Sequence, residues 1–330
     1  MRIAVDAMGG DDAPGVVVEG AIEALSVVDG AELVLVGHRD QLEESARALG
    51  GLPDRITLVH ASQVVGMDEK PTDALRRKRD SSIARCVHLV AQGEAQALVS
   101  AGNTGAVVAH ATLKLRLLEG VTRPGIAVGM PSLDGVTLVI DCGANVQCTP
   151  EHLYQFGVMA AAYAKDVHGK RHPKVGLLNI GEEETKGTAL VREAADLLED
   201  STLNYIGFIE GRDVFTDAVD VVVCEGFVGN VLLKVSEGVA EAIFTMLKGG
   251  LKRTLRRRVG ARLVEFALRE LAARVDHAEQ GGAPLLGVNG TVMIAHGGSN
   301  RRAIANAIRS AAEAAAYRVN EHIIAGLHPE

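Results

Sequence analysis

Tryptophan is absent from this 330-residue chain, and aromatic residues make up only 3% of it. The hydrophobic content of 47% therefore comes mainly from Ala, Val, Leu and Ile, which pack well where strands lie between two layers of helices. A chain of this length can bury a large core without help from disulfides or metals. The composition favours an α/β protein over a β-sandwich.

Cysteine is scarce as well. Cys86, Cys142, Cys148 and Cys224 show neither CxxC spacing nor the density of a small secreted framework, so we expect free thiols in a reducing compartment. No run approaches the about 18 apolar residues of a membrane-spanning helix, and Asp6 interrupts the first apolar run before a signal sequence can form. These absences predict a cytoplasmic protein.

An excess of positive charge is also missing. The formal net charge is -8, which argues against nucleic acid as a partner, because such surfaces need clustered Lys and Arg. There is no GxGxxG after a strand, no GxxxxGK[ST], no GxSxG and no HExxH. Dinucleotide binding, nucleotide hydrolysis, a serine nucleophile and a catalytic metal thus lack their sequence signatures.

Short apolar runs rich in β-branched residues alternate with helix-like stretches along most of the chain. This is the pattern of βαβ units with right-handed crossovers, and it predicts a mostly parallel sheet. Strands are expected at 3–5, 33–36, 56–59, 97–99, 136–140, 175–178, 203–208 and 219–223. Because no long linker or internal repeat occurs, residues 1–330 are predicted to form a single α/β domain.

The alternation stops at about residue 231. Residues 231–276 are rich in strong helix formers and predict a protruding helical arm, with Gly249 and Gly250 as the expected break. Within it, Leu255, Val259 and Leu263 recur every four residues among basic residues that no acid interrupts. The sequence leaves three uses open: docking on anionic lipid headgroups, docking an acidic protein, or packing within a dimer.

Glycine and small polar residues gather where the predicted strands end. In open parallel sheets these ends bind ligands, and small residues there let backbone N–H groups face an anion at a helix N-terminus. A single turn of this kind serves conformation alone, but several in one chain indicate an anion site. Six occur, at 6–11, 100–106, 141–145, 179–187, 224–230 and 296–300.

The side chains of these turns include several amides and cations, among them Asn145, Asn179 and, one helical turn further on, Lys234. Such groups bind an oxyanion and stabilise negative charge on a carbonyl oxygen, as acyl transfer to phosphate requires. We expect Lys186 and Asn230 to stabilise the transition state, and Asn103 with the backbone of Thr104 and Gly105 to hold phosphate. The remaining predicted substrate contacts are Asp6, Gly9, Gly10, Gly102, Asp141, Gly143, Asn145, Asn179, Gly181, Glu182, Gly187, Glu225, Gly229, His296, Ser299 and Asn300.

Seven segments carry a resemblance to a known family. They are MRIAVDAMGGDDAPG from Met1, DEKPTDALRRKRDSS from Asp68, SAGNTGA from Ser100, the turn at 141–145, GLLNIGEEETKG from Gly176, EGFVGNVLLK from Glu225 and AHGGSN from Ala295. Together, and in this order, they resemble the PlsX family of bacterial acyl-carrier-protein:phosphate acyltransferases. The likeness covers essentially the whole chain.

The resemblance implies reversible transfer of a fatty acyl group from acyl carrier protein to inorganic phosphate, the first step of glycerophospholipid synthesis, with no cofactor. It implies a three-layer α/β/α fold like that of isocitrate and isopropylmalate dehydrogenases, in a homodimer. It also implies an arm able to touch a membrane surface, and leaves open contact with a downstream glycerol-3-phosphate acyltransferase.

Four alternatives stay open at this point. Asp6, Asp141 and Glu225 either orient the donors or cap helices. Cys142 offers a thiol nucleophile, although no His lies nearby in the sequence. The basic residues 76–79 either attract an acidic carrier protein or form a solvated helix end. Beside the acyltransferase stand a metal-dependent hydroxyacid dehydrogenase and a non-catalytic membrane scaffold.

Overall fold

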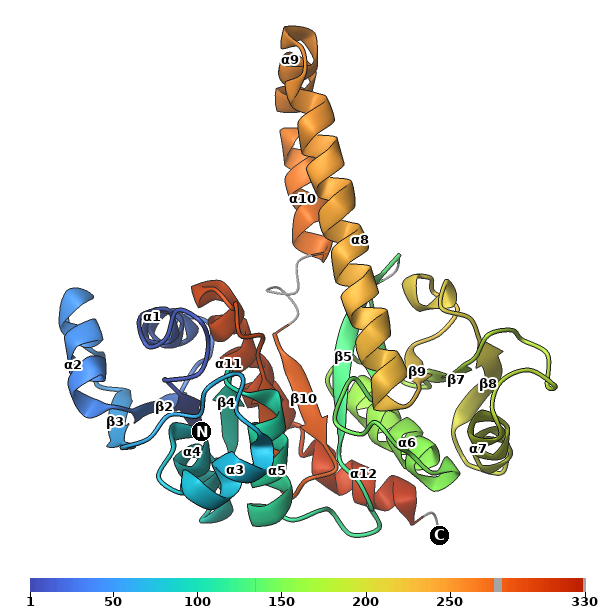
Figure 1. Ribbon diagram of the computed structural model, residues 1–330, viewed down its shortest axis with the longest axis horizontal. Helices are drawn as coiled ribbons and strands as arrows, with labels where there is room; N and C mark the ends of the chain where they lie inside the picture. The colour runs from blue at the N-terminus through green and yellow to red at the C-terminus, as the bar shows by residue number, and fades with distance from the viewer. Residues whose placement is uncertain (134, 276–280, 329–330) are drawn as a thin grey trace.

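A single sheet runs through the molecule (Figure 1). The computed structural model describes residues 1–133, 135–275 and 281–328. Within these ranges the sheet has 11 strands in the order β3-β2-β1-β4-β11-β10-β5-β6-β9-β7-β8. The strands are β1 (Arg2–Asp6), β2 (Glu32–Gly37), β3 (Ile56–His60), β4 (Ala97–Ser100), β5 (Gly125–Ser132), β6 (Gly135–Ile140), β7 (Lys174–Leu178), β8 (Asn204–Ile209), β9 (Val221–Val223), β10 (Ala283–Leu286) and β11 (Thr291–Ile294).

The sheet consists of two parallel halves joined by antiparallel strands. β3, β2, β1, β4 and β11 pair in parallel, and so do β6, β9, β7 and β8. Between them, β10 is antiparallel to both β11 and β5, and β5 is antiparallel to β6. Three antiparallel steps reverse the direction, so the strands of one half run against those of the other. The prediction of a mostly parallel sheet is confirmed.

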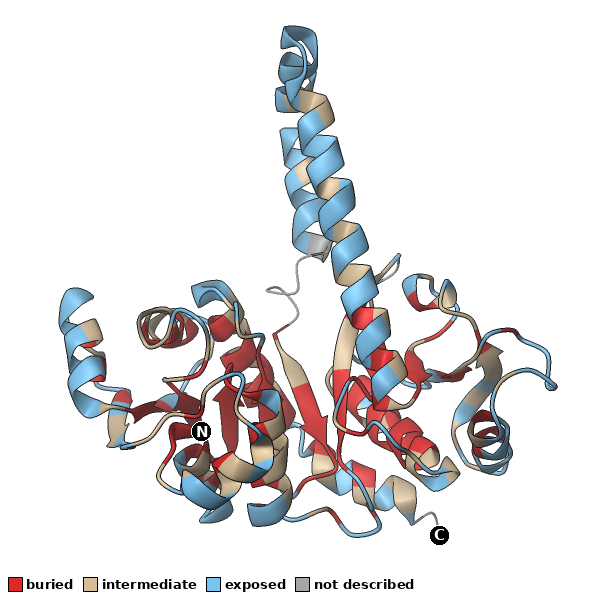
Figure 2. Ribbon diagram, in the orientation of Figure 1, coloured by how far each residue is buried: buried red, intermediate tan, exposed pale blue. Residues whose placement is uncertain are grey.

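Helices cover both faces of the sheet, which confirms the three-layer arrangement. The helices are α1 (Gly15–Ala24), α2 (Arg39–Ala48), α3 (Pro71–Arg77), α4 (Ser82–Ala91), α5 (Thr104–Lys114), α6 (Pro150–Asp166), α7 (Ala189–Glu199), α8 (Gly226–Lys252), α9 (Leu255–Leu263), α10 (Glu265–Val275), α11 (Arg301–Ala316) and α12 (Val319–Leu327). The inner strands are largely buried, whereas the edge strands β3 and β8 are only partly buried and the arm is mostly exposed (Figure 2).

Three clusters of buried apolar residues follow from these layers. α1 and α11 pack on one face of the first half, and α6, α7 and α12 pack on one face of the second half. The third cluster is continuous across both halves, because it includes Val107 of α5 and Leu233 of α8 together with Leu98 and Val222 of the sheet. The helices α5 and α8 therefore lie over the same face.

The expected strands that precede glycine-rich turns are all present, with ends shifted by one or two residues. The sequence analysis missed β5, β10 and β11, the central antiparallel strands and their neighbour. β5 carries two glycines and a proline, and β10 and β11 have only four residues each. Such segments give neither a clear period nor a long apolar run.

The arm is formed by α8, which rises from the sheet, and by α9 and α10, which return along it (Figure 1). The expected break at Gly249 and Gly250 was wrong, since α8 continues through both to Lys252. The chain turns at Arg253 and Thr254 instead, where the Thr254 hydroxyl accepts a hydrogen bond from the Arg257 N–H and caps α9. Residue 276, the predicted end, lies outside the described residues.

The described residues can be compared with the sequence predictions on disulfides and on membrane-spanning helices. All four cysteines are free, three of them buried. None of the helices in the described ranges is both long enough and apolar enough to cross a bilayer.

Candidate active site

A buried carboxylate joins the turns that follow β1 and β4. One oxygen of Asp6 accepts a hydrogen bond from the Ser100 hydroxyl at 2.7 Å, and the other accepts one from the Met8 N–H at 3.2 Å. The Ser100 hydroxyl oxygen in turn accepts a hydrogen bond from the Gly102 N–H at 3.1 Å. Burial raises the pKa of Asp6, and the hydrogen bond from Ser100 opposes that rise. Asp6 thus fixes the shape of both turns.

The glycines of these turns permit a very close approach of two backbones. A Cβ on Gly9 would lie 2.5 Å from the Gly102 nitrogen, so only glycine fits there. Gly10 has a φ of +107°, and the Asp11 N–H donates to the Gly297 carbonyl at 2.9 Å. The turn after β11 therefore joins the first two, and the three form the N-terminal loop group, residues 6–11, 100–105 and 296–300.

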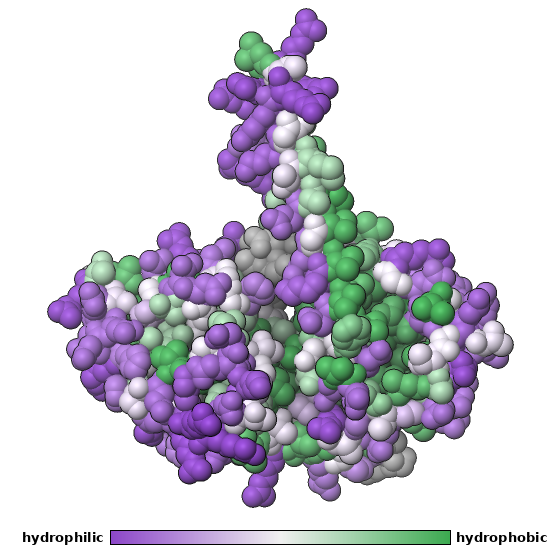
Figure 3. All heavy atoms as spheres, viewed as in Figure 1, coloured by the Kyte–Doolittle hydropathy of each residue, from purple (hydrophilic) through white to green (hydrophobic). Residues whose placement is uncertain are grey.

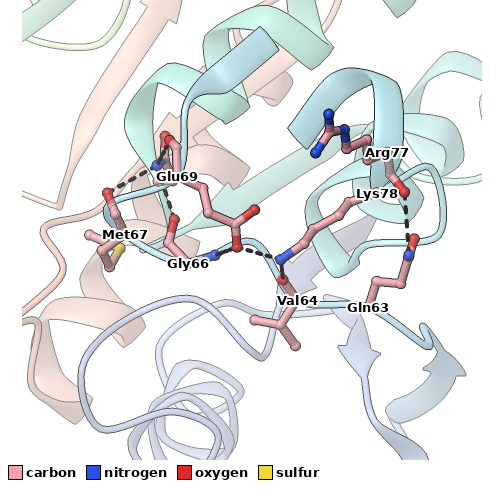
Figure 4. A network of polar contacts seen from close by, with 8 residues as sticks. Gln63, Val64, Gly66, Met67, Glu69, Arg77 and Lys78 are labelled. Carbon is pink, nitrogen blue, oxygen red and sulfur yellow. Dashed lines mark hydrogen bonds and ion pairs between the residues drawn. The ribbon is translucent and has the colours of Figure 1, made fainter. Parts of the chain in front are cut away.

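The Asn103 side chain connects this group to the segment between β3 and α3. Its oxygen accepts the Ala106 N–H at 2.9 Å and so caps α5. Its nitrogen donates to the carbonyl oxygens of Gly66, Met67 and Glu69 at 3.1, 3.0 and 2.9 Å; Figure 4 labels these three acceptor residues. The amide predicted to hold phosphate is thus already saturated by protein partners.

A second contact holds the same segment. The Lys78 ammonium contacts both the Glu69 carboxylate and the Val64 carbonyl oxygen, and the Glu69 carboxylate also accepts the Gly66 N–H at 2.8 Å (Figure 4). The hydrogen bond from Lys78 is the main cause of the lowered pKa of Glu69. The sequence analysis placed Glu69 in a family motif and Lys78 among the basic residues 76–79, but it did not pair the two. Their pairing across the α3 helix gave no local signal.

The turns that follow β6 and β9 are organised by Asp141. Its buried carboxylate accepts hydrogen bonds from the N–H groups of Ile126, Ala144 and Asn145 at 3.0, 3.1 and 2.6 Å. It also accepts one from the Asn145 amide at 3.0 Å, and that amide donates to the Pro124 carbonyl as well. Burial raises the pKa of Asp141, and these four donors oppose the rise.

The first turn of α8 lies directly on this loop. A Cβ on Gly229 would lie 2.0 Å from the Asp141 carbonyl oxygen, and one on Gly226 would lie 2.6 Å from the Asn145 carbonyl oxygen. Gly143, with a φ of +114°, faces the Asn230 side chain. Asn230 itself is exposed. The structure thus brings Asn230, Gly143 and the Asp141 loop together.

The turn after β7 lies at the same edge, because β7 pairs in parallel with β9. Asn179 closes this turn: its oxygen accepts the Ile180 N–H and its nitrogen donates to the Lys186 carbonyl oxygen. Gly187, with a φ of +84°, packs against that amide, and Gly181 packs against the Lys186 side chain. Lys186 is exposed and makes no ion pair among the described residues. The residues 141–145, 179–187 and 224–230 form the C-terminal loop group.

The remaining predicted residues take simpler places. Asn300 caps α11 by accepting the Ala303 N–H, and His296 accepts the Gly298 N–H. Ser299 is half-buried in that turn, and Glu182 is exposed on the turn after β7. Glu225 precedes α8 without a side-chain capping bond, and Lys234 pairs with Glu237 at 2.8 Å.

The structure therefore divides the six predicted turns into two groups of three. Because the strands of the two halves run in opposite directions, the two loop groups follow strands that point opposite ways. Even so, α5 and α8 lie over one face of the sheet, on either side of β10 in Figure 1. Two cavities, of about 290 and 630 Å³, lie around Ser132 and Val136 of the β5–β6 hairpin. Neither is lined by a predicted site residue.

The geometry bears on the thiol alternative. The Cys142 thiol is buried and donates to the Val139 carbonyl oxygen at 3.3 Å, and burial raises its pKa well above the usual range, so a thiolate is disfavoured. Within the described residues, no three His, Cys, Asp or Glu side chains gather as a metal site would require.

Known proteins are similar to this chain along almost its whole length. A family model described as "Fatty acid synthesis protein" matches residues 1–322. A phosphate acyltransferase of Syntrophotalea carbinolica is 52% identical over 330 residues, covering 99% of this chain and 94% of that protein.

Solved structures share the fold at low identity. A phosphotransacetylase from Streptococcus pyogenes superposes with a TM-score of 0.68 at 18% identity, over 96% of this chain and 94% of the other. A putative 4-hydroxythreonine-4-phosphate dehydrogenase from Salmonella typhimurium gives 0.52 at 14% identity, over 94% and 99%. The fold is thus one that phosphotransacylases and dehydrogenases share.

Proposed function

Because this chain belongs to the PlsX family of fatty acid synthesis proteins, we propose that it is an acyl-carrier-protein:phosphate acyltransferase. It transfers a fatty acyl group reversibly from the carrier's thioester to inorganic phosphate, and the acyl phosphate enters glycerophospholipid synthesis. The observation that carries this proposal is the match at about half identity, over nearly full length, to proteins named phosphate acyltransferase.

The chemistry needs no enzyme nucleophile. An oxygen of bound phosphate adds to the thioester carbonyl, a tetrahedral oxyanion forms, the C–S bond breaks, and the carrier's thiolate leaves and takes a proton from solvent. Phosphate is already an anionic nucleophile at neutral pH, so the protein must hold it beside the carbonyl and offset charge repulsion. The buried Cys142 thiol is not required for any step.

The exposed side chains and backbone N–H groups of the two loop groups suit the holding of phosphate and the stabilisation of the oxyanion. We assign phosphate binding to the first turn of α5, where Thr104 is exposed and backbone N–H groups lack helical partners. Lys186 and Asn230 of the C-terminal loop group stabilise the oxyanion. Asp6, Asp141, Asn145 and Asn179 act indirectly, since their polar atoms are occupied in shaping the turns that carry these groups.

A direct assay tests the proposal. Purified protein is mixed with acyl carrier protein thioester, with phosphate present or withheld, and acyl phosphate and free thiol are both measured. We expect equal amounts of the two products only when phosphate is present. Thiol release that ignores phosphate would indicate a hydrolase, and a nicotinamide-dependent absorbance change would indicate the dehydrogenase alternative.

The carrier protein is proposed to dock on the basic residues 76–79 at the C-terminal end of α3. Arg76, Arg77 and Arg79 are exposed, whereas Lys78 is held internally by Glu69. Carrier affinity should therefore fall as salt rises, because exposed charges are screened.

We further propose that residues 1–330 act as one cytoplasmic domain and that two chains associate through the arm. α8 carries an exposed apolar stripe (Phe227, Val231, Val235, Val239, Ile243 and Met246), visible as the apolar band in Figure 3, whereas the tip is hydrophilic. The basic α9, with exposed Leu255, Val259 and Leu263, suits reversible contact with an anionic membrane surface. Binding to a downstream glycerol-3-phosphate acyltransferase would use the same exposed tip.

A further inference from the structure

A lysine outside the predicted site lies beside the first turn of α5. Lys70 immediately precedes Pro71, the first residue of α3. Pro71 packs on Gly105 so closely that a Cβ on Gly105 would lie 2.5 Å from the proline ring. The start of α3 and the start of α5 are therefore in contact, and Lys70 stands at that junction.

The backbone that carries Lys70 is fixed from two sides. The Glu69 carbonyl, which belongs to the peptide bond leading into Lys70, accepts the Asn103 amide at 2.9 Å. The Glu69 side chain is held by Lys78 (Figure 4). Both anchors are on Glu69, so they fix the backbone that leads into Lys70 relative to Asn103, the residue that caps α5.

The Lys70 side chain itself is exposed and uncommitted. It makes neither an ion pair nor a side-chain hydrogen bond among the described residues, although Asp73 lies three positions further on. The first turn of α5, next to this junction, carries the partial positive charge of its N–H groups, and the Lys70 ammonium adds a full positive charge nearby. An anion bound at the junction would be attracted by both.

We propose that Lys70 binds the phosphate substrate at the first turn of α5, and that Asn103 is a positioning residue acting through it. This inference rests on the proposed function and names a further group of the same site. Asn103 suits the positioning role because one side chain must cap α5 through its oxygen and also donate to three carbonyls. Asp or Ser would keep the cap but supply no such donor.

The first experiment compares Lys70→Met with the wild-type protein in the acyl phosphate assay. We expect the KM for phosphate to rise about 10- to 100-fold, as loss of a charge-assisted hydrogen bond predicts, with the KM for acyl carrier protein unchanged. Lys114→Met is the matched control, because it removes the same charge from the exposed other end of α5. A larger effect on the carrier KM than on the phosphate KM would overturn the proposal in favour of carrier docking.

A binding measurement keeps the test independent of turnover. Inorganic phosphate alone should raise the unfolding temperature of the wild-type and Lys114→Met proteins by mass action, and of Lys70→Met only at about tenfold or higher concentration. An equal shift in all three proteins would overturn the role of Lys70. If the wild-type protein makes no acyl phosphate yet shows this pattern, the proposed function fails while the anion site stands.

The positioning role of Asn103 is tested by a double-mutant cycle. Asn103→Ser keeps a cap for α5 and loses the amide nitrogen that donates to three carbonyls, so the phosphate KM should rise toward that of Lys70→Met. Combined with Lys70→Met it should add little, since both changes remove one interaction. Additive effects on the phosphate KM would mean that Asn103 contacts phosphate directly and would contradict the positioning role.

Discussion

At the scale of single residues, the site divides into buried groups that shape the turns and exposed groups that are free to meet substrate. Asp6, Asp141 and Asn103 are buried with every polar atom engaged, as buried polar groups must be. Lys186 and Asn230 are exposed. Chemistry is therefore assigned to the second set.

Lys186 provides the sharpest residue-scale prediction. If its ammonium stabilises the oxyanion, Lys186→Met should lower kcat about 100-fold with little change in the KM for phosphate, since the charge develops only in the transition state. Steady-state kinetics at saturating phosphate measure this. Lys165→Met, at the exposed end of α6, is the control, and a variant of Lys186 that retains kcat while its KM rises would contradict the role.

Sequence alone could propose which residues gather but not what each one does. Asp6 and Asn103 were found because glycines and polar residues follow apolar strands. Whether an amide faces substrate or protein depends on partners 34 to 37 positions away, as with the carbonyls that Asn103 holds. Lys70 escaped notice for the same reason, because its significance comes from the contact between Pro71 and Gly105.

At the scale of elements, the seat of α8 on the Asp141 loop depends on one glycine. In Gly229→Ala the new methyl group would lie 2.0 Å from a backbone oxygen, so the helix or the loop must move. We expect the free energy of unfolding to fall by about 2–3 kcal/mol. Urea unfolding measures it.

Gly238 supplies the control on the same helix, because a Cβ there meets nothing within 4 Å. Gly238→Ala should leave stability unchanged or raise it by up to about 1 kcal/mol, as helix propensity predicts. Equal effects of the two substitutions would show that the close approach does not constrain α8.

The link between β3 and α4 predicts an acid-dependent loss of stability. Asp80 accepts hydrogen bonds from the Ser62 hydroxyl and N–H and pairs with Arg85, and these contacts lower its pKa from 3.8 to about 2. A carboxyl with a depressed pKa stabilises the fold above its unfolded pKa and loses this effect as pH falls through the folded value. The stability difference between wild type and Asp80→Asn should therefore shrink between pH 4 and about 2.

Urea unfolding at several pH values from 5 downward checks this expectation. A difference that stays constant across the window would show that Ser62 and Arg85 do not favour the ionised carboxyl.

Short segments that side-chain contacts hold in place, such as the link between β3 and α4, were not predictable from periodicity. The strands β1, β2, β4 and β7 were predictable, because each is a buried apolar run ended by a turn.

At the scale of the whole molecule, the reversal of strand direction was invisible to the sequence analysis. It results from β5, whose glycines and proline hide its strand character, and from the four-residue β10, and it divides the six turns into two groups. The two loop groups are still connected structurally, because one apolar cluster lies under both α5 and α8. A transferase that must hold two substrates gains from this arrangement, because each half can carry one of them.

The arm sets the last prediction, which concerns assembly. The stripe on α8 repeats every three or four residues and leaves Val235, Val239 and Ile243 more than half exposed, at 58, 53 and 54%. Such a stripe on a helix is favourable only when another apolar surface covers it, and a second copy of the arm matches its length and spacing.

Ile243→Glu places a charge in the middle of that stripe, so we expect it to convert a dimer into single chains, as measured by analytical ultracentrifugation without lipid. Glu241→Gln, on a neighbouring face of the same helix, should remain a dimer. A wild-type protein that sediments as one chain would contradict arm-mediated pairing. A variant that stays paired would assign the interface to another surface and leave the stripe for a different apolar partner.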